Sequence, residues 1–164
     1  MKHGIVAAGV PILAIILAGV LGDVGKARLV FWRWKDPLPG CRAFSKLADN
    51  DSRIDITGLK SKLGEFPSEP KAQNALWYRL YRKHSAALRV LQAHKVYLLT
   101  RDMTAISAFF AIVMSTSIFL QTATARIGTI YAVALIAQYL LIATAARNYG
   151  ERFVMNVLLE ETQS

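Results

Sequence analysis

The chain has 164 residues, 54% of them hydrophobic, and carries a formal net charge of +9 at neutral pH. So large an apolar fraction is unusual for a soluble domain, and it excludes a disordered chain and an extended coiled coil. Cys41 is the only cysteine in the sequence, which excludes a secreted scaffold held together by intramolecular disulfides.

Three runs of the sequence contain no Asp, Glu, Lys, Arg or His. They cover residues 4–22, 103–125 and 127–146, with lengths of 19, 23 and 20 residues. About 20 apolar residues allow a helix to cross the hydrocarbon core of a bilayer. A charged side chain at the centre of such a helix costs roughly 2.5 to 3.5 kcal/mol. The sequence therefore predicts an all-α membrane protein with three transmembrane helices.

The first run, residues 4–22, also has features of a secretory signal peptide, because small residues precede Asp23 where cleavage would occur. The run is longer than the apolar core of most signal peptides, and several basic residues follow it closely, which opposes export. We therefore expect a retained anchor and keep a cleaved signal peptide as the alternative.

Basic residues near the ends of the three runs are distributed unevenly, and such residues favour the cytoplasmic side of a membrane. Only Lys2 and Arg126 fall on one side, and the others fall on the opposite side: Lys26, Arg28, Arg33, Lys35, Arg42, Lys83, Arg89, Lys95, Arg101, Arg147 and Arg152. The sequence therefore predicts a multi-pass protein of the inner membrane, with its N-terminus outside and its C-terminus inside. A tight outer turn near residues 124–126 would join the second and third spans.

These boundaries divide the chain into four parts. Residues 1–25 are the predicted first transmembrane helix, 26–101 a basic cytoplasmic subdomain, 102–147 a transmembrane helical hairpin, and 148–164 a C-terminal cytoplasmic amphipathic helix. Residues 26–101 contain 16 Lys or Arg against 6 Asp or Glu, a balance of +10. This charge favours an anionic partner for the subdomain.

Basic and aromatic residues alternate directly after the first run. Indole rings favour the level of the lipid headgroups, and long basic side chains reach lipid phosphates. We predict a membrane interface with anionic headgroups at Lys26, Arg28, Trp32, Arg33, Trp34 and Lys35. The same alternation also occurs in nucleic-acid platforms, but its position next to a span favours lipid, and no double-stranded nucleic acid is expected as a partner.

The first half of the cytoplasmic subdomain is rich in proline and glycine, so it should consist mostly of loops. One short helix is predicted over residues 56–63, with Asp55 or Thr57 as its N-cap and Gly64 as its C-cap.

A longer helix is predicted to start at Ser68-Glu69-Pro70, with Ser68 as its cap and Pro70 within the first turn. Apolar residues then recur at helical spacing as far as Leu99, and a break is expected near His84 and Ser85. Because this amphipathic helix needs a cover, we expect the apolar residues of the C-terminal tail to pack on it: Phe153, Val154, Val157 and Leu158. The alternative is that the tail lies in the membrane surface.

Three basic residues and one aromatic residue are predicted to share the outer face of this helix. Arg79, Arg82 and Lys83 are the candidates for receiving an anion, and Tyr78 would stack on a base if the anion were a nucleotide. An aromatic core stripe beside a solvated basic face has the same pattern, so that reading stays open.

The three runs contain small and polar residues at helical spacing. The predicted packing residues are Ala14, Ala18, Gly22, Ser107, Ala111, Ser115, Gly128, Ala132 and Gln138. Small residues let helices approach closely, either within one chain or between copies, so a homo-oligomer is one expectation. The runs offer no ionisable group at membrane depth, which argues against a transporter or proton pump.

No motif in the sequence indicates a metal, a cofactor or a nucleophile with its base. Asp49, Asp51 and Asp55 resemble the start of a calcium loop, but Ile54 and Lys60 occupy the positions that need glycine and glutamate. We predict a non-enzymatic membrane receiver or effector, and expect no cofactor or metal. The alternatives are an accessory subunit of a larger membrane complex, and a lipid-acting enzyme that uses His84 or His94 with one of these aspartates.

Overall fold

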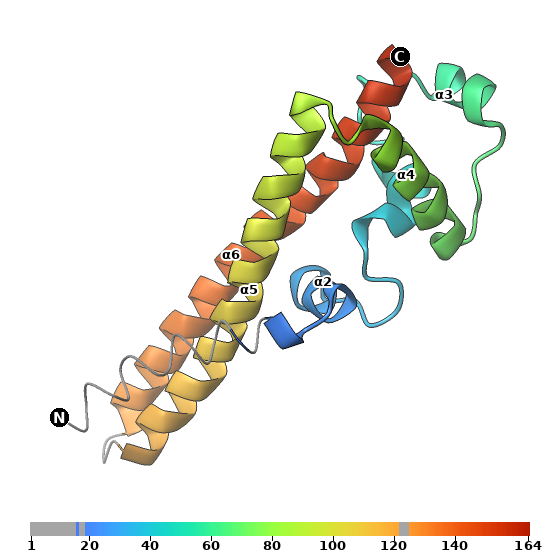
Figure 1. Ribbon diagram of the computed structural model, residues 1–164. Coiled ribbons are helices and arrows are strands. Elements are labelled where there is room, and N and C mark those ends of the chain that lie inside the picture. The colour runs from blue at the N-terminus through green and yellow to red at the C-terminus, as the bar shows by residue number, and fades with distance from the viewer. Residues whose placement is uncertain (1–15, 17–18, 122–124) are drawn as a thin grey trace. The chain divides into compact units, whose positions relative to one another are not determined.

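The computed structural model describes residue 16 and residues 19–121 and 125–164, and every element in that part of the chain is helical (Figure 1). The elements are α2 (Asp23–Phe31), the 3-10 helix η1 (Pro39–Arg42), the π-helix η2 (Ala43–Leu47), α3 (Ile56–Leu63), α4 (Pro70–His84), α5 (Leu88–Gln121) and α6 (Ala125–Gln163). They form two compact units. Unit 1 comprises residues 1–32 and 100–146, and unit 2 comprises residues 33–99 and 147–164. The two long helices, α5 and α6, contribute to both units.

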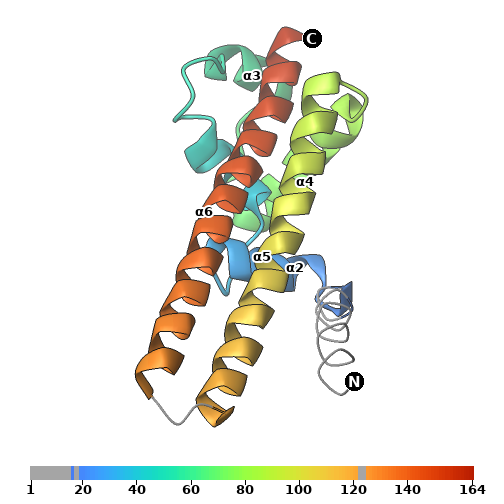
Figure 2. The ribbon, with the colours of Figure 1, turned by 90° about the vertical axis from the view of Figure 1, so that its left-hand side faces the viewer.

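Two helices of the described part are long and apolar enough to cross a membrane, with spans of Leu88–Leu120 and Ala125–Gln163. Only 17% and 11% of the residues in their most apolar windows are buried, whereas the core helix of a soluble protein is mostly buried. In unit 1 the two helices run side by side in both views (Figures 1 and 2). Most of the predicted first span lies outside the described residues. In the predicted outer turn, Thr124 lies outside them, whereas Ala125 and Arg126 belong to α6.

The short helix α2 packs on the other two helices of unit 1. It begins after Gly22 and ends at Trp32, whose backbone is left-handed (φ 52°, ψ 41°) and donates to the Arg28 carbonyl. A left-handed residue other than glycine is unfavourable by roughly 1–2 kcal/mol. The indole Nε1 of Trp32 donates to the Tyr139 hydroxyl (2.9 Å), which donates in turn to the Leu29 carbonyl (2.8 Å), so tertiary contacts hold this end of the helix.

Unit 2 begins with a proline-rich loop that is fastened to α4 by one amide. The Gln73 side chain is 1% exposed, and its Oε1 accepts hydrogen bonds from the backbone N–H groups of Phe44 (3.3 Å) and Ser45 (3.1 Å). Its Nε2 donates to the Ser68 carbonyl (3.3 Å). Because a buried amide is stable only when it is hydrogen bonded, these contacts fix η2 against α4.

Gly40 marks the closest approach of the same loop to α4. A β-carbon at this position would lie 2.4 Å from Oδ1 of Asn74 and 2.7 Å from the Trp77 ring. The loop can therefore pack against α4 only with glycine here.

The short helix α3 confirms the prediction for residues 56–63. Asp55 caps it by accepting a hydrogen bond from the Gly58 N–H (2.9 Å), and Gly64 ends it with a positive φ of 79°. Both end residues could be predicted from the sequence, because helix capping depends on residues that are close together in the chain.

The predicted start of the longer helix is confirmed to within one residue, since α4 begins at Pro70 and its cap is different. Glu69, not Ser68, is the N-cap, and its carboxylate accepts a hydrogen bond from the Ala72 N–H (2.7 Å). A cap at Ser68 would have accepted from the Lys71 N–H, so moving the cap to Glu69 moves the bonded backbone group by one residue as well. The predicted break is confirmed, since α4 ends at His84 and α5 begins at Leu88.

An aromatic cluster forms the centre of unit 2. Phe153 of α6 contacts Trp77 edge to face (centroids 5.2 Å apart) and Tyr81 (5.3 Å), and it stacks on His94 (4.9 Å). The Trp77 indole is 6% exposed and donates to the Val154 carbonyl (3.4 Å). The predicted cover of the amphipathic helix by the C-terminal tail is therefore confirmed.

Candidate functional site

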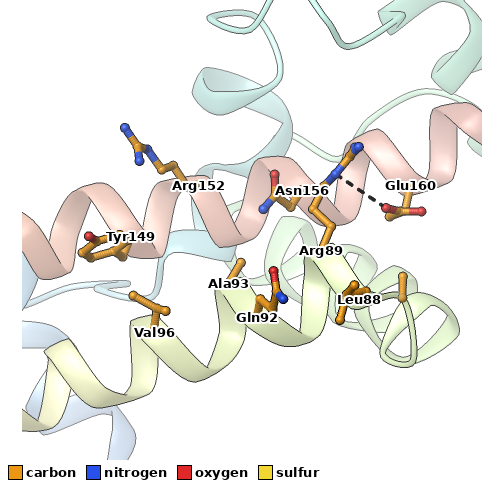
Figure 3. A pocket seen from close by; sticks show the side chains of 10 residues that line it. Leu88, Arg89, Gln92, Ala93, Val96, Tyr149, Arg152, Asn156 and Glu160 are labelled. Atoms are coloured by element: carbon orange, nitrogen blue, oxygen red, sulfur yellow. Dashed lines mark ion pairs between the residues drawn. The ribbon is translucent and has the colours of Figure 1, made fainter.

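A groove of about 750 Å³ lies between the parts of α5 and α6 that belong to unit 2 (Figure 3). One wall comes from the start of α5 and the turn before it, and the other from α6 beyond the apolar run. The lining residues are Ala87, Leu88, Arg89, Gln92, Ala93, Val96, Tyr149, Arg152, Asn156 and Glu160. The groove thus combines an aliphatic surface with two guanidinium groups, two carboxamides, the Tyr149 ring and the Glu160 carboxylate. The guanidinium groups favour an organic anion, whereas the Glu160 carboxylate opposes one.

The two arginines of the groove differ in their surroundings, but neither is held by a short, buried ion pair among the contacts described for them. Arg89 reaches toward α6, where its Nε lies 3.9 Å from Oε1 of Glu160, and both side chains are partly exposed. Arg152 is exposed and extends outward from α6 (Figure 3). Exposed ion pairs contribute about 0–1 kcal/mol, so an anion that offers a bidentate partner can displace Glu160 from Arg89.

The groove was missed in the sequence because its arginines lie far apart in the chain and on different helices. Arg89 entered the prediction only as a basic residue near a span, and Arg152 entered in the same way. A helical register for the C-terminal tail places Tyr149, Arg152, Asn156 and Glu160 on one face, and this spacing is the signal that could have found that wall.

The predicted anion set lies on α4, away from the residues that line the groove. Tyr78, Arg79, Arg82 and Lys83 are all exposed, and the Arg82 guanidinium lies over the Tyr78 ring, 5.7 Å from its centroid. Lys83 is engaged, because its Nζ lies 2.8 Å from Oε2 of Glu161. The structure therefore places the four residues on one exposed surface, with one of the three cations already paired.

Glu161 is the most enclosed acidic side chain in unit 2, with 5% of it exposed. Its carboxylate accepts hydrogen bonds from Lys83 Nζ (2.9 and 2.8 Å) and contacts His84 Nε2 at 2.5 Å, while Lys62 Nζ donates to its backbone carbonyl (3.1 Å). Burial raises the pKa of this carboxyl, but the hydrogen bonds and charges of Lys83 and His84 outweigh burial, so its pKa lies below the ordinary value. The ionised carboxylate thus joins the end of α6 to α4.

Four charges from two helices, α2 and α5, meet in unit 1. Lys26 of α2 donates to Asp102 (2.9 Å), and Arg101 of α5 donates to Asp23 of α2 (2.8 Å) and also to Asp102 (3.2 Å). The Lys26 and Arg101 side chains are only 10% and 11% exposed. The group is neutral overall, which is how charges are retained at the edge of an apolar segment.

The predicted interface residues divide into two groups. Lys26 is buried in the cluster just described, whereas Arg28, Trp32, Trp34 and Lys35 are exposed. Arg33 is half-buried in unit 2.

Burial and the nearby charges of Arg42 and Arg147 lower the pKa of Arg33, and the charge of Glu151 opposes them. Arg33, Arg42 and Arg147 therefore lie close enough to repel one another, and Glu151 partly offsets this repulsion.

The predicted packing residues also differ in what they face. Ser107 and Gly128 are buried. A β-carbon on Gly128 would lie 3.1 Å from the Phe119 ring, so Gly128 and Phe119 mark a close approach of α6 to α5. Ala111, Ser115 and Ala132 are half-buried, whereas Gln138 and Gly22 are exposed. Ala14 and Ala18 lie outside the described residues.

The residues of the enzymatic alternative are engaged elsewhere in unit 2. His84 binds Glu161, the Tyr81 hydroxyl is hydrogen bonded to His94 Nδ1 (3.1 Å), and Asp51 binds Arg53. Asp55 caps α3, and the described residues contain no cluster of three or more His, Cys, Asp or Glu that could hold a metal ion. Burial, together with the charge of Asp36, raises the pKa of the Cys41 thiol, which disfavours a reactive thiolate.

The groove is therefore an open site between two helices, and the face of α4 carries the exposed set Tyr78, Arg79, Arg82 and Lys83. Both can attract an anion, and the groove can contact one from two helices. Comparison of the chain with protein-family models, with curated proteins and with solved structures found no match.

Proposed function

We propose that this chain is a non-enzymatic membrane receiver that takes up an organic anion in the groove of unit 2. In this proposal α5, α6 and the first apolar run cross the inner membrane, with the N-terminus outside and unit 2 in the cytoplasm. The observation that carries it is that Arg89 and Arg152 line a groove built by the same two helices that continue into the apolar segments.

Charge supports unit 2 as the receiving part. It contains 15 Lys or Arg and 9 Asp or Glu, a net charge of +6, and the C-terminal glutamates already neutralise some of its cations. The remaining charge attracts anions to the unit before any specific contact is made. The exposed face of α4, with Arg79 and Arg82, then acts as the attracting surface, and the groove acts as the binding site.

Helix continuity supports a response to binding. An anion held between Arg89 and Arg152 would draw the two walls of the groove together, and α5 and α6 continue from these walls into unit 1 as single helices. A ligand shifts a conformational equilibrium only through contacts that differ between the two states. Loss of the loose Arg89–Glu160 pair in exchange for a bidentate contact is such a difference.

The test is anion binding to the full-length protein in nanodiscs of phosphatidylcholine, measured by calorimetry with ADP and with pyrophosphate as probes. The double substitution Arg89→Gln with Arg152→Gln should weaken binding at least tenfold. In contrast, Arg79→Gln with Arg82→Gln should leave the affinity nearly unchanged and should not make it depend more strongly on salt concentration. If only the second pair weakens binding, the site is the face of α4. If the wild-type protein binds neither probe and co-purifies with a stoichiometric partner, it is an accessory subunit.

A further inference from the structure

Gln138 is a polar side chain that lies exposed on α6, inside the apolar segment of unit 1. It is near the midpoint between Arg126 and Arg147, the basic residues that bound the uncharged run. If this segment crosses the membrane, as the proposed function states, the amide lies near the bilayer centre. Hydrocarbon offers an amide neither a donor nor an acceptor, so a side chain at this depth needs a protein partner.

The residues around Gln138 form a regular seam along α6. Spacings of four and three residues alternate through six positions: Ile127, Tyr131, Ala134, Gln138, Leu141 and Ala145. The first five are exposed, with Leu141 at 74%, and Ala145 is half-buried. The pattern repeats every seven residues, at 127, 134 and 141 and at 131, 138 and 145, and two helices with this repeat pack in a left-handed pair.

The seam is separate from the face that α6 turns toward α5. Gly128 contacts the Phe119 ring of α5 across a space that a β-carbon would fill, and Ala143 and Ala146 are fully buried. These small residues let the two helices of unit 1 approach closely. The hairpin is thus already closed without any use of Gln138.

We propose that the seam binds the same seam of a second copy of this chain, with the two Gln138 amides hydrogen bonded to each other across a two-fold axis. A carboxamide both donates and accepts, so two identical amides at the same depth satisfy one another. Ala134 beside them allows the close approach that this bond requires. The inference rests on the membrane location in the proposed function and is independent of the anion groove.

The first apolar run of the same chain is the competing occupant of this face. Asp23 follows that run directly, and its carboxylate is bound to Arg101 of α5 (2.8 Å). The last turn of α2, at Leu29, and the following Trp32 contact Tyr139 of α6. The run therefore joins α2 at the end held by α5, which favours a second copy as the partner of the seam on α6.

Disulfide cross-linking of the full-length protein in its native membrane tests the seam. In a Cys41→Ser background, Ala134→Cys, which keeps the Gln138 amide, should give a covalent dimer on mild oxidation. Ile136→Cys is the matched control, because it is 49% exposed and lies only two residues away on a different face. It should give less than a tenth as much dimer. Equal cross-linking at both positions, or none at Ala134→Cys, would overturn the pairing.

Variants that retain Cys41 provide a second measurement. In mild detergent, Gln138→Leu should weaken the dimer at least tenfold, whereas Gln138→Asn should keep it. A dimer that Gln138→Leu leaves unchanged overturns the amide contact, and an intrachain disulfide between Gln138→Cys and Ala14→Cys assigns the face to the first run instead. Labelling of Gln138→Cys by a membrane-impermeant maleimide overturns the membrane location together with the pairing, whereas a missing dimer without such labelling overturns the pairing alone.

Discussion

The Nζ atom of Lys26 lies 2.9 Å from Oδ1 of Asp102, so a cation that follows the first apolar run is bound to the acidic residue that directly precedes the second. Arg101 shares the same carboxylate oxygen. Two enclosed cations therefore depend on one aspartate, and its removal has consequences for both.

Asp102→Asn should destabilise unit 1 by about 1–3 kcal/mol, because both Lys26 and Arg101 lose a charged acceptor while remaining largely buried. The free energy of unfolding in mixed detergent micelles measures the effect. Asp23→Asn is the control, since Asp23 is 76% exposed and its pair with Arg101 should contribute at most about 1 kcal/mol. A larger loss from the control would contradict the central place of Asp102.

Acid should loosen unit 2 through Glu161. The pKa of this carboxyl is lower in the folded protein, so its contribution to stability is complete above the ordinary pKa of a glutamate and is lost as the pH falls through the lowered value. The midpoint of thermal unfolding, followed between pH 7 and pH 3, should therefore drop at the acid end. Glu161→Gln should lower the midpoint at pH 7 and flatten the acid limb, because the variant has no carboxyl to titrate.

Glu160→Gln serves as the control for the acid response. Glu160 contacts only Arg89, at 3.9 Å, so its substitution should leave the acid limb in place. An acid limb that persists in Glu161→Gln and disappears in Glu160→Gln would reverse the assignment.

Gly40→Ala should destabilise unit 2 by about 1–3 kcal/mol, because the new methyl group would overlap Asn74 and the Trp77 ring. Urea unfolding monitored by near-UV circular dichroism measures the loss. Gly22→Ala is the matched control, since a β-carbon there would meet nothing within 4 Å. Similar effects at the two positions would mean that the loop does not pack on α4 as described.

Phe153→Ala should lower the stability of unit 2 by about 3–5 kcal/mol, because it empties the middle of the aromatic cluster. Phe153→Leu, which fills most of the volume, should cost clearly less. Thermal unfolding of the two variants distinguishes the effect of lost side-chain volume at position 153 from the effect of lost aromatic contacts. If both variants unfold like the wild type, the C-terminal part of α6 does not cover α4.

The sequence predicted the features of this fold that depend on near neighbours. The bounds of α3 follow from Asp55 and Gly64, and the gap between α4 and α5 follows from weakened helical patterning around Ser85. The cap of α4 was wrong by one residue because serine and glutamate both offer an oxygen at the right place, and only the geometry chooses between them.

The charge pairs and the groove could not be predicted in the same way. Lys83 and Glu161 are 78 residues apart, and nothing local says which of many basic residues will meet which acidic one. The same holds for Arg89 and Arg152, which become two walls of a groove only when α5 and α6 lie together in unit 2. The aromatic cluster was easier to anticipate, because apolar faces must be covered and the C-terminal tail carries apolar residues at helical spacing that can cover one.

The three tryptophans give the protein a built-in optical distinction between its parts. Trp77 is 6% exposed in the core of unit 2, whereas Trp32 and Trp34 are 49% and 83% exposed. An indole shielded from solvent emits at shorter wavelength and is protected from collisional quenchers. Lipids brominated near the headgroup therefore quench Trp32 and Trp34 wherever these rings meet the bilayer, and the emission that remains reports the packing of Trp77 alone.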